Sequence, residues 1–175
     1  MKALILRVIL TSAVALLGFA STTLAWTDKG CKDSTLEGDY GFTVSGTIFL
    51  PGGVTVLREG IALTHFDGKG NLHQEDYVLS NGVLPPGPTD ASTGFHTDET
   101  GTYTVNPDCT GTAEIDTKAL DPSGNVVPGP VIKLKFVLSN HGNAIHTVVS
   151  SLTLPSGPVP AAIRSDGYKI GKLDD

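Results

Sequence analysis

The stretch Ile132-Lys-Leu-Lys-Phe-Val-Leu138, followed by Asn140-His-Gly-Asn143, decides the fold of this chain. Every second residue of its first part is apolar and faces one way, and this set is Ile132, Leu134, Phe136 and Leu138. A period of two is that of a β-strand with one face toward a core. The four residues that follow have the composition of a tight hairpin turn. The stretch therefore predicts a strand that returns at once into an antiparallel neighbour.

The rest of the chain repeats this pattern and shows no helical periodicity after the N-terminal segment. Thr, Val and Ile are frequent, and the 21 glycines and 11 prolines recur at turns every 10 to 15 residues. This spacing is typical of an all-β sandwich or barrel. The expected strands are 38–49, 54–66, 71–80, 99–105, 110–119, 132–138, 144–154 and a weaker one within 161–170.

The connections between these strands alternate between two kinds. Tight turns lie at 67–70, 106–109 and 140–143. The other connections are rich in Pro and Gly and pass through 50–53, 84–89, 121–130 and 154–160. Alternate connections of an up-and-down meander lie at opposite ends of the strands. We therefore expect a single antiparallel meander barrel of about eight strands, with a Pro/Gly-rich mouth, although an open sandwich remains compatible with the pattern.

The first 25 residues have the three parts of a secretory signal peptide. Lys2 and Arg7 precede an apolar run at 8–20, and Thr23-Leu-Ala25 supplies small residues for cleavage. The run is shorter than the ~20 residues that span a bilayer. We expect cleavage after Ala25, or alternatively after Ala20, and an exported protein, periplasmic or extracellular, without a membrane anchor. The predicted parts are a signal peptide (1–25), a segment that closes one barrel end (26–35) and the barrel domain (36–175).

Cys31 and Cys109 are the two cysteines of the chain. In an oxidising compartment such a pair most often forms a disulfide, and the close spacing of a metal site is absent. Cys109 belongs to a predicted tight turn. We therefore expect the N-terminal segment to cross the tight-turn end of the barrel and to be fixed there by the disulfide.

The charge of the chain excludes some partners. The formal net charge is −6, and loss of the signal peptide would remove two basic residues and bring it to −8. No basic run is present, so neither nucleic acid nor an anionic membrane surface is an expected partner.

The chemistry-bearing residues form no strong motif. Phe66-Asp-Gly-Lys-Gly-Asn71 has Lys where a calcium loop needs an oxygen ligand, which favours a hairpin turn. If the hairpin loop has an even number of residues, His65 and His73 lie on opposite faces of the sheet. Only a one-residue bulge would bring them side by side. We expect no metal and no cofactor.

Isolated polar residues on strands remain as candidates for a ligand or catalytic site. In the neighbouring carboxylate pairs Glu75-Asp76 and Glu114-Ile-Asp116 most side chains should face water, and a buried one would be a candidate general acid. The weak candidates for a ligand site are Tyr40, Tyr77, Tyr103, Glu75 and His96.

The predicted strand 144–154 has apolar residues on both faces. Regular alternation turns Ile145 and Val149 inward and Val148, Leu152 and Leu154 outward. The outward set would form an apolar patch suited to self-association through this strand. A bulge that shifts the alternation is the other interpretation.

Three motifs carry a resemblance to a known family. They are Gly38-x-Tyr40-x-Phe42, Phe66-Asp-Gly-Lys-Gly-Asn71 and Gly101-Thr-Tyr-Thr-Val-Asn-Pro-Asp-Cys-Thr-Gly-Thr112. Together they resemble the signatures of a largely uncharacterised family of small secreted bacterial β proteins, over about residues 36–115, and that family supplies no catalytic residues to carry over. The predicted meander is also similar in architecture to lipocalin-like and allene-oxide-cyclase-like barrels, but fold alone does not define function.

Three functions are compatible with these features. The first is a secreted barrel that binds a small apolar or amphipathic molecule through the Pro/Gly-rich end. The second is a cofactor-free cyclase or isomerase, which needs at least two polar groups that converge on one cavity. The third is a structural or surface-interaction protein. The sequence favours the first and leaves enzymatic activity uncertain.

Overall fold

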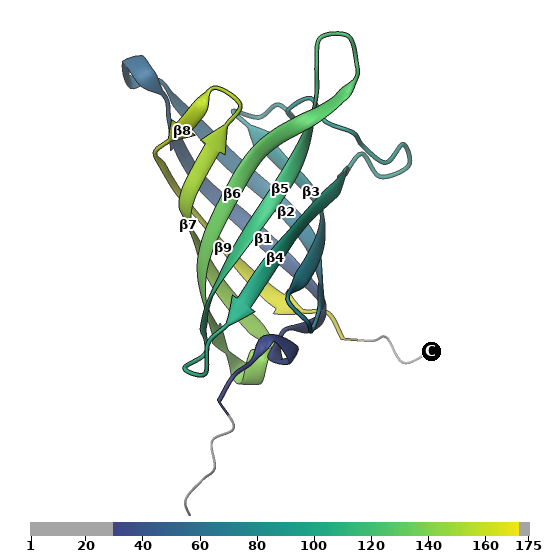
Figure 1. The fold of residues 1–175 in the computed structure, drawn as a ribbon. Helices are drawn as coiled ribbons and strands as arrows, with labels where there is room; N and C mark the ends of the chain where they lie inside the picture. The colour runs from purple at the N-terminus through teal and green to yellow at the C-terminus, as the bar shows by residue number, and fades with distance from the viewer. Residues whose placement is uncertain (1–29, 172–175) are drawn as a thin grey trace, which may run out of the picture.

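The computed structural model describes residues 30–171, so the predicted signal peptide lies outside the described residues (Figure 1). The strands are β1 (Glu37–Phe49), β2 (Thr55–Asp67), β3 (Asn71–Ser80), β4 (His96–Val105), β5 (Thr110–Leu120), β6 (Val126–Ser139), β7 (Ala144–Leu154), β8 (Gly157–Val159) and β9 (Ala161–Lys169). Three short 3-10 turns are η1 (Asp33–Thr35), η2 (Pro51–Gly53) and η3 (Asn140–Gly142).

The strands form a closed antiparallel barrel. Each strand from β1 to β7 pairs with the next, and β9 lies between β7 and β1 and closes the ring. The short β8 pairs only with the end of β7. The predicted all-β meander barrel of about eight strands is therefore confirmed, with β9 as the eighth strand of the ring and β8 as an addition to it.

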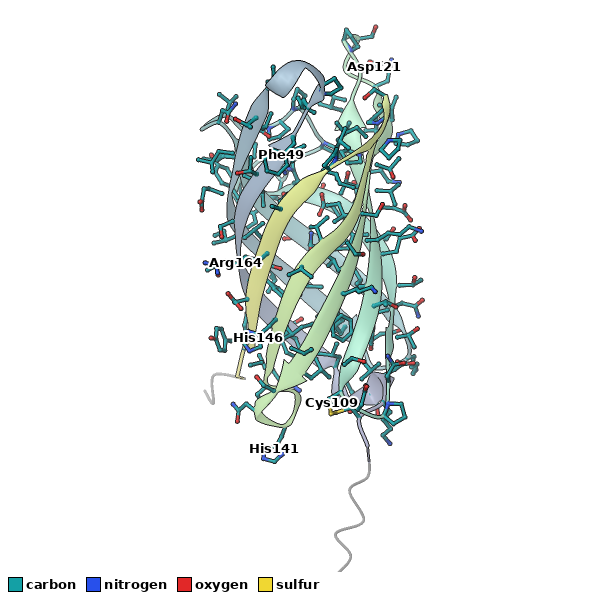
Figure 2. All side chains as sticks on the ribbon, turned by 90° about the vertical axis from the view of Figure 1, so that its left-hand side faces the viewer. Phe49, Cys109, Asp121, His141, His146 and Arg164 are labelled. Atoms are coloured by element: carbon teal, nitrogen blue, oxygen red, sulfur yellow. A yellow bond between two sulfur atoms is a disulfide. The ribbon has the colours of Figure 1, made fainter. Side chains whose placement is uncertain are left out.

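The two ends of the barrel differ as the connections predict. The tight turns β2–β3, β4–β5 and β6–β7 gather at the lower end in Figure 1, and the longer loops gather at the upper end. In Figure 2 the labelled Cys109 and His141 mark the turn end, and Phe49 and Asp121 mark the loop end. Some boundaries differ from the prediction: Val127–Pro130 belongs to β6, where Pro128 lies opposite Lys118 beside a register shift. In addition, β4 begins at His96 rather than at residue 99, and the predicted loop at 154–160 contains β8.

The N-terminal segment closes the turn end. Cys31 and Cys109 form the predicted disulfide. Beyond it, the Asp33 carboxylate accepts a hydrogen bond from the backbone N–H of Val105 at 2.7 Å, and Leu36 is completely buried. A buried Leu side chain and a backbone hydrogen bond both fix this segment against the barrel. The described part of the segment thus packs against the turn end of the barrel.

Aromatic side chains fill the barrel above this segment. The rings of Tyr40 and Tyr103 both meet Phe66 edge to face, with centroids 5.3 and 5.1 Å away. The Phe136 ring lies over Gly111, where an added Cβ would come within 2.2 Å of it. A larger residue at position 111 would therefore clash, and glycine makes room for the ring. These aromatic groups form a solid floor at the turn end.

β7 contains a bulge, which was the other interpretation of the apolar residues in 144–154. Leu134 lies opposite Val149 and Lys133 opposite Ser151, so Ser150 is the extra residue. Ser150 and Ser151 are both exposed, and Leu152 returns to the interior at 4% exposure. The prediction that Leu152 and Leu154 face outward is therefore wrong, because the bulge shifts the alternation by one residue.

The β2–β3 hairpin also differs from its predicted register. Phe66 pairs with Leu72, and His65 pairs with His73, so the two histidines share a face. Five residues, 67–71, separate Phe66 from Leu72, whereas the prediction assumed an even number. Asp67 stabilises it, because one carboxylate oxygen accepts hydrogen bonds from the backbone N–H groups of Lys69 and Asn71. Both histidines are exposed on the outer surface.

Candidate ligand-binding site

A cavity of about 550 Å³ occupies the barrel between the aromatic floor and the loop end. Phe66, Leu72 and Phe136 line its lower part, and Leu50, Pro85 and Pro155 from the loops line its upper part. Cavities of roughly 300–1,000 Å³ are typical of small-molecule sites. The barrel therefore has room for one small ligand, with access from the loop end.

The walls of the cavity divide into an apolar and a polar side. The mainly apolar side comes from β5, β6 and β7, with Ala113, Ile115, Ile132, Leu134, Ile145, Val149, Leu152 and Leu154, and its polar members are Thr117, Lys118 and Thr147. The more polar side comes from β2, β3 and β4, where Arg58, Thr64, Gln74, Asp76, Ser80, His96 and Glu99 line the cavity beside apolar residues such as Val56, Ala62 and Val78. A site of this kind suits a molecule with one apolar and one polar part.

A β-bulge in β4 creates the polar side. Gln74 lies opposite Glu99 and Asp76 opposite His96, so β4 has one residue more than β3 over this interval. Asp98 takes up the extra length with a left-handed backbone, φ 62°. In a regular strand residues 96 and 99 would face opposite sides. The bulge turns both side chains toward the cavity.

His96 joins the barrel wall to the loop above it. Its Nδ1 lies 3.0 Å from the Asp76 carboxylate, and its Nε2 lies 2.9 Å from the Pro85 carbonyl oxygen. A carbonyl only accepts, so Nε2 carries a proton, and an ionised Asp76 requires a proton on Nδ1 as well. The hydrogen bond to Asp76 raises the pKa of His96, which favours this imidazolium form.

Glu99 is a buried carboxyl group that holds its proton near neutral pH. It is 3% exposed, and Gln74 Nε2 donates to its Oε2 at 2.8 Å, while Gln74 Oε1 accepts from Thr64. Burial, together with the negative charge of Asp76, raises the pKa of Glu99 to about 7. The cavity therefore contains a group that can both give and take a proton close to neutral pH.

Arg58 lies closer to the loop end on the same polar side. It sits opposite Ser80 in the β2–β3 register and donates a hydrogen bond from Nη1 to the Ser80 hydroxyl. Burial lowers the pKa of Arg58, and the carboxyl groups of Asp76 and Glu99 act in the opposite direction. An arginine remains charged under such conditions.

Asp76, His96 and Glu99 are also the group among the described residues that could hold a metal ion, with ligand atoms within 4.8 Å of one another. Both nitrogens of His96, however, are already engaged in hydrogen bonds, with the Asp76 carboxylate and the Pro85 carbonyl. A metal ligand must offer a free lone pair. The three residues thus fit a hydrogen-bonded cluster better than a metal centre.

The structure separates the residues predicted as ligand candidates. His96 lines the cavity. Tyr40 and Tyr103 lie in the closed end, where their hydroxyls donate to the carbonyls of Gly142 and Leu36. Glu75 and Tyr77 alternate with the inward Asp76 and lie on the outer surface. Four of the five candidates are thus not lining residues of the cavity.

Sequence reasoning missed Arg58, Gln74 and Glu99. Arg58 and Gln74 occupy inward positions of regularly alternating strands, so the period of two could have placed them. Glu99 could not be placed in this way, because its orientation depends on the bulge. The available signal was Asp98, since Asp tolerates a left-handed backbone better than most residues.

The other histidine contacts lie outside the barrel. His65 pairs with Asp39 and His146 with Asp166, in both cases with a largely exposed side chain. His146 lies opposite Val137, as predicted. The exposed large apolar residues are not concentrated on β7, where Val148 is outward, but include Leu57, Ile61 and Leu63 on β2. Self-association through 144–154 stays a prediction, and of the three apolar side chains expected on the outer face only Val148 lies there.

The fold and the cavity define the chain as a closed antiparallel barrel with an internal site. A comparison with known proteins finds no family model, no curated protein and no solved structure that matches it. The resemblance of its motifs to a secreted bacterial family stays a prediction. No helix among residues 30–171 is long and apolar enough to cross a membrane.

Proposed function

We propose that the protein is an exported barrel that binds one small amphipathic molecule inside its cavity. The observation that carries this proposal is the cavity of about 550 Å³ with one apolar and one polar side. Burial of an alkyl chain against β5–β7 contributes about 0.8 kcal/mol per methylene group. Polar groups on β2–β4 would orient the head of the molecule.

The location fits this function. The predicted signal peptide would export the chain, and the disulfide Cys31–Cys109 is compatible with an oxidising compartment, periplasmic or extracellular. Small apolar molecules are poorly soluble in such compartments, and a closed barrel shields them from water. No cofactor is part of this proposal.

A cavity-filling variant tests the binding. We expect Val149→Trp, whose side chain points into the cavity, to weaken binding of the neutral probe N-phenyl-1-naphthylamine at least tenfold, measured by its fluorescence. Val148→Trp is the matched control, because the neighbouring side chain is 54% exposed on the outer face. Equal binding by both variants, or no binding by the wild type, would contradict the proposal.

A second candidate function is a cofactor-free isomerase or cyclase, which the pKa of about 7 at Glu99 favours. A group that is half protonated near pH 7 can move a proton between two substrate atoms. Incubation of the protein in D₂O with a small-molecule extract of its source cells, read by mass spectrometry, would reveal deuterium uptake. We expect uptake with the wild type and none with Glu99→Gln if this function holds; equal profiles would exclude it.

A further inference from the structure

The Arg58 guanidinium is a cation inside the barrel without an anionic partner. The described residues form four pairs between a basic and an acidic side chain, and the basic members are His65, His96, Lys133 and His146. The hydrogen bond of Arg58 goes instead to a neutral hydroxyl, that of Ser80. Transfer of a cation from water without a compensating anion is costly.

The nearby carboxyl groups are engaged elsewhere. Asp76 holds the imidazole of His96, and Glu99 accepts from the amide of Gln74. These are the charged and titratable groups that line the polar side together with Arg58. No acidic side chain among residues 30–171 thus lies within ion-pair distance of the guanidinium.

The side chain of Arg58 faces the cavity rather than the solvent outside the barrel. On β2 the outward residues Leu57 and Glu59 are exposed, and Arg58 between them is partly buried. Arginine has five N–H donors in a planar fork, of which Ser80 takes one. A carboxylate matches two donors of such a fork side by side.

The position of Arg58 leaves length for an apolar chain below it. Phe66, at the floor, is eight residues further along β2, or about 26 Å of strand at ~3.3 Å per residue. With the usual strand tilt of 35–45° this corresponds to a depth of about 20 Å. An extended hydrocarbon chain of about a dozen carbons fits that depth, and the apolar side of the cavity follows it along β5–β7.

We infer that the ligand is an amphiphile with a carboxylate head, held by Arg58 near the loop end, with its hydrocarbon chain directed toward the aromatic floor. This inference rests on the proposed binding function and names the class of its ligand. The bound carboxylate supplies the ion-pair partner that the Arg58 guanidinium lacks among the described residues. A neutral amphiphile of the same length would occupy the same cavity and leave the guanidinium without its partner.

The test compares dodecanoate with 1-dodecanol as competitors of N-phenyl-1-naphthylamine at pH 8. We expect the wild type to bind dodecanoate at least tenfold more tightly than dodecanol. Arg58→Gln should reduce the affinity for dodecanoate at least tenfold and leave that for dodecanol within twofold. Arg58→Lys keeps the charge without the fork, and we expect an intermediate affinity for dodecanoate.

Arg164→Gln is the matched control. Arg164 belongs to the residues around the cavity, but its side chain is exposed and points away from the barrel in Figure 2, so only its backbone faces inward. We expect this variant to bind both competitors like the wild type.

The possible failures can be told apart. Equal affinity of the wild type for dodecanoate and dodecanol would overturn the carboxylate inference and leave the binding function intact. The same conclusion follows if Arg58→Gln and Arg164→Gln bind dodecanoate equally. A wild type that binds neither competitor nor the probe would overturn the binding function itself. If Arg58→Gln also loses its affinity for dodecanol, the Arg58→Lys variant decides the question. An Arg58→Lys variant that binds dodecanol like the wild type and dodecanoate more weakly supports the inference. Any other pattern overturns it.

Discussion

At the scale of single residues, the polar side of the cavity depends on the backbone of Asp98. Its left-handed conformation, φ 62°, places the side chains of His96 and Glu99 on the same side of β4. The burial that follows changes the chemistry of Glu99, because a charged carboxylate is disfavoured where water is excluded. One backbone torsion thus buries Glu99 and brings its pKa to about 7.

The raised pKa of Glu99 predicts a pH-dependent stability. Between its ordinary value of 4.5 and the folded value of about 7, the folded protein binds a proton that the unfolded chain has released. The stabilising contribution is therefore present at low pH and is lost as the pH rises through about 7. We expect the free energy of unfolding to fall by on the order of 2 kcal/mol from pH 5 to pH 8 because of this group.

Urea denaturation of Glu99→Gln at both pH values measures this contribution. The amide cannot ionise, so the variant should lose this part of the pH dependence and become more stable than the wild type at pH 8. Glu75→Gln, on the outer face of β3, is the control and should follow the wild type. A wild type and a Glu99→Gln variant with parallel pH profiles would show that Glu99 ionises normally in the folded state.

At the scale of elements, the bulge at Ser150 decides which side chains of β7 enter the cavity. Because Leu134 lies opposite Val149 and Lys133 opposite Ser151, removal of Ser150 would leave a regular strand with the same pairs. Removal of Val148 would instead move Val149 to an outward position and Ser150 to an inward one. Each deletion shortens β7 by one residue, but they differ in what faces the interior.

We expect deletion of Val148 to destabilise the protein by about 1–2 kcal/mol more than deletion of Ser150, since a valine leaves the cavity wall and a serine enters it. Urea denaturation of the two deletion variants measures the difference. The deletion of Ser150 should also retain binding of N-phenyl-1-naphthylamine. Equal stabilities of the two variants would mean that the bulge moves to a new position and does not fix the alternation.

The strands and turns of this protein can be predicted from the local sequence, but the positions of its bulges cannot. The alternation in 132–138 predicts strand β6, and the turn residues at 140–143 predict its return. The extra residues at Asp98 and Ser150 are set by the closure of the sheet, which joins strands far apart in the sequence. Glu99 was missed for this reason, whereas Arg58 and Gln74 lie on regularly alternating strands and could have been placed from the sequence.

At the scale of the whole molecule, the disulfide fixes the closed end to the start of the barrel. It links residues 78 positions apart, which the chain-entropy model equates with a stabilisation of about 4 kcal/mol, as an upper estimate. The N-terminal segment that it holds covers the floor through the buried Leu36. The cavity lies on the other side of that floor.

We therefore expect the double variant Cys31→Ser/Cys109→Ser to lose up to about 4 kcal/mol of unfolding free energy and still to bind N-phenyl-1-naphthylamine at low temperature. Urea denaturation and probe fluorescence under non-reducing conditions measure the two properties on the same sample. Unchanged stability would show that the contacts of Leu36 and Asp33 hold the segment without the covalent link. Loss of binding by a folded variant would show that the floor shapes the cavity.

The pairing of β1 with β9 matters while the chain is still being synthesised. β1 bonds to β9 from Tyr40, opposite Lys169, to Ile48, opposite Ala161. Until residues 161–169 have been synthesised, both β1 and β7 lack their neighbour and present unpaired N–H and C=O groups along an edge. Such edges recruit other strands and lead to aggregation. A premature stop before Ala161 would therefore leave a sheet with two open edges, a hazard that the completed ring does not have.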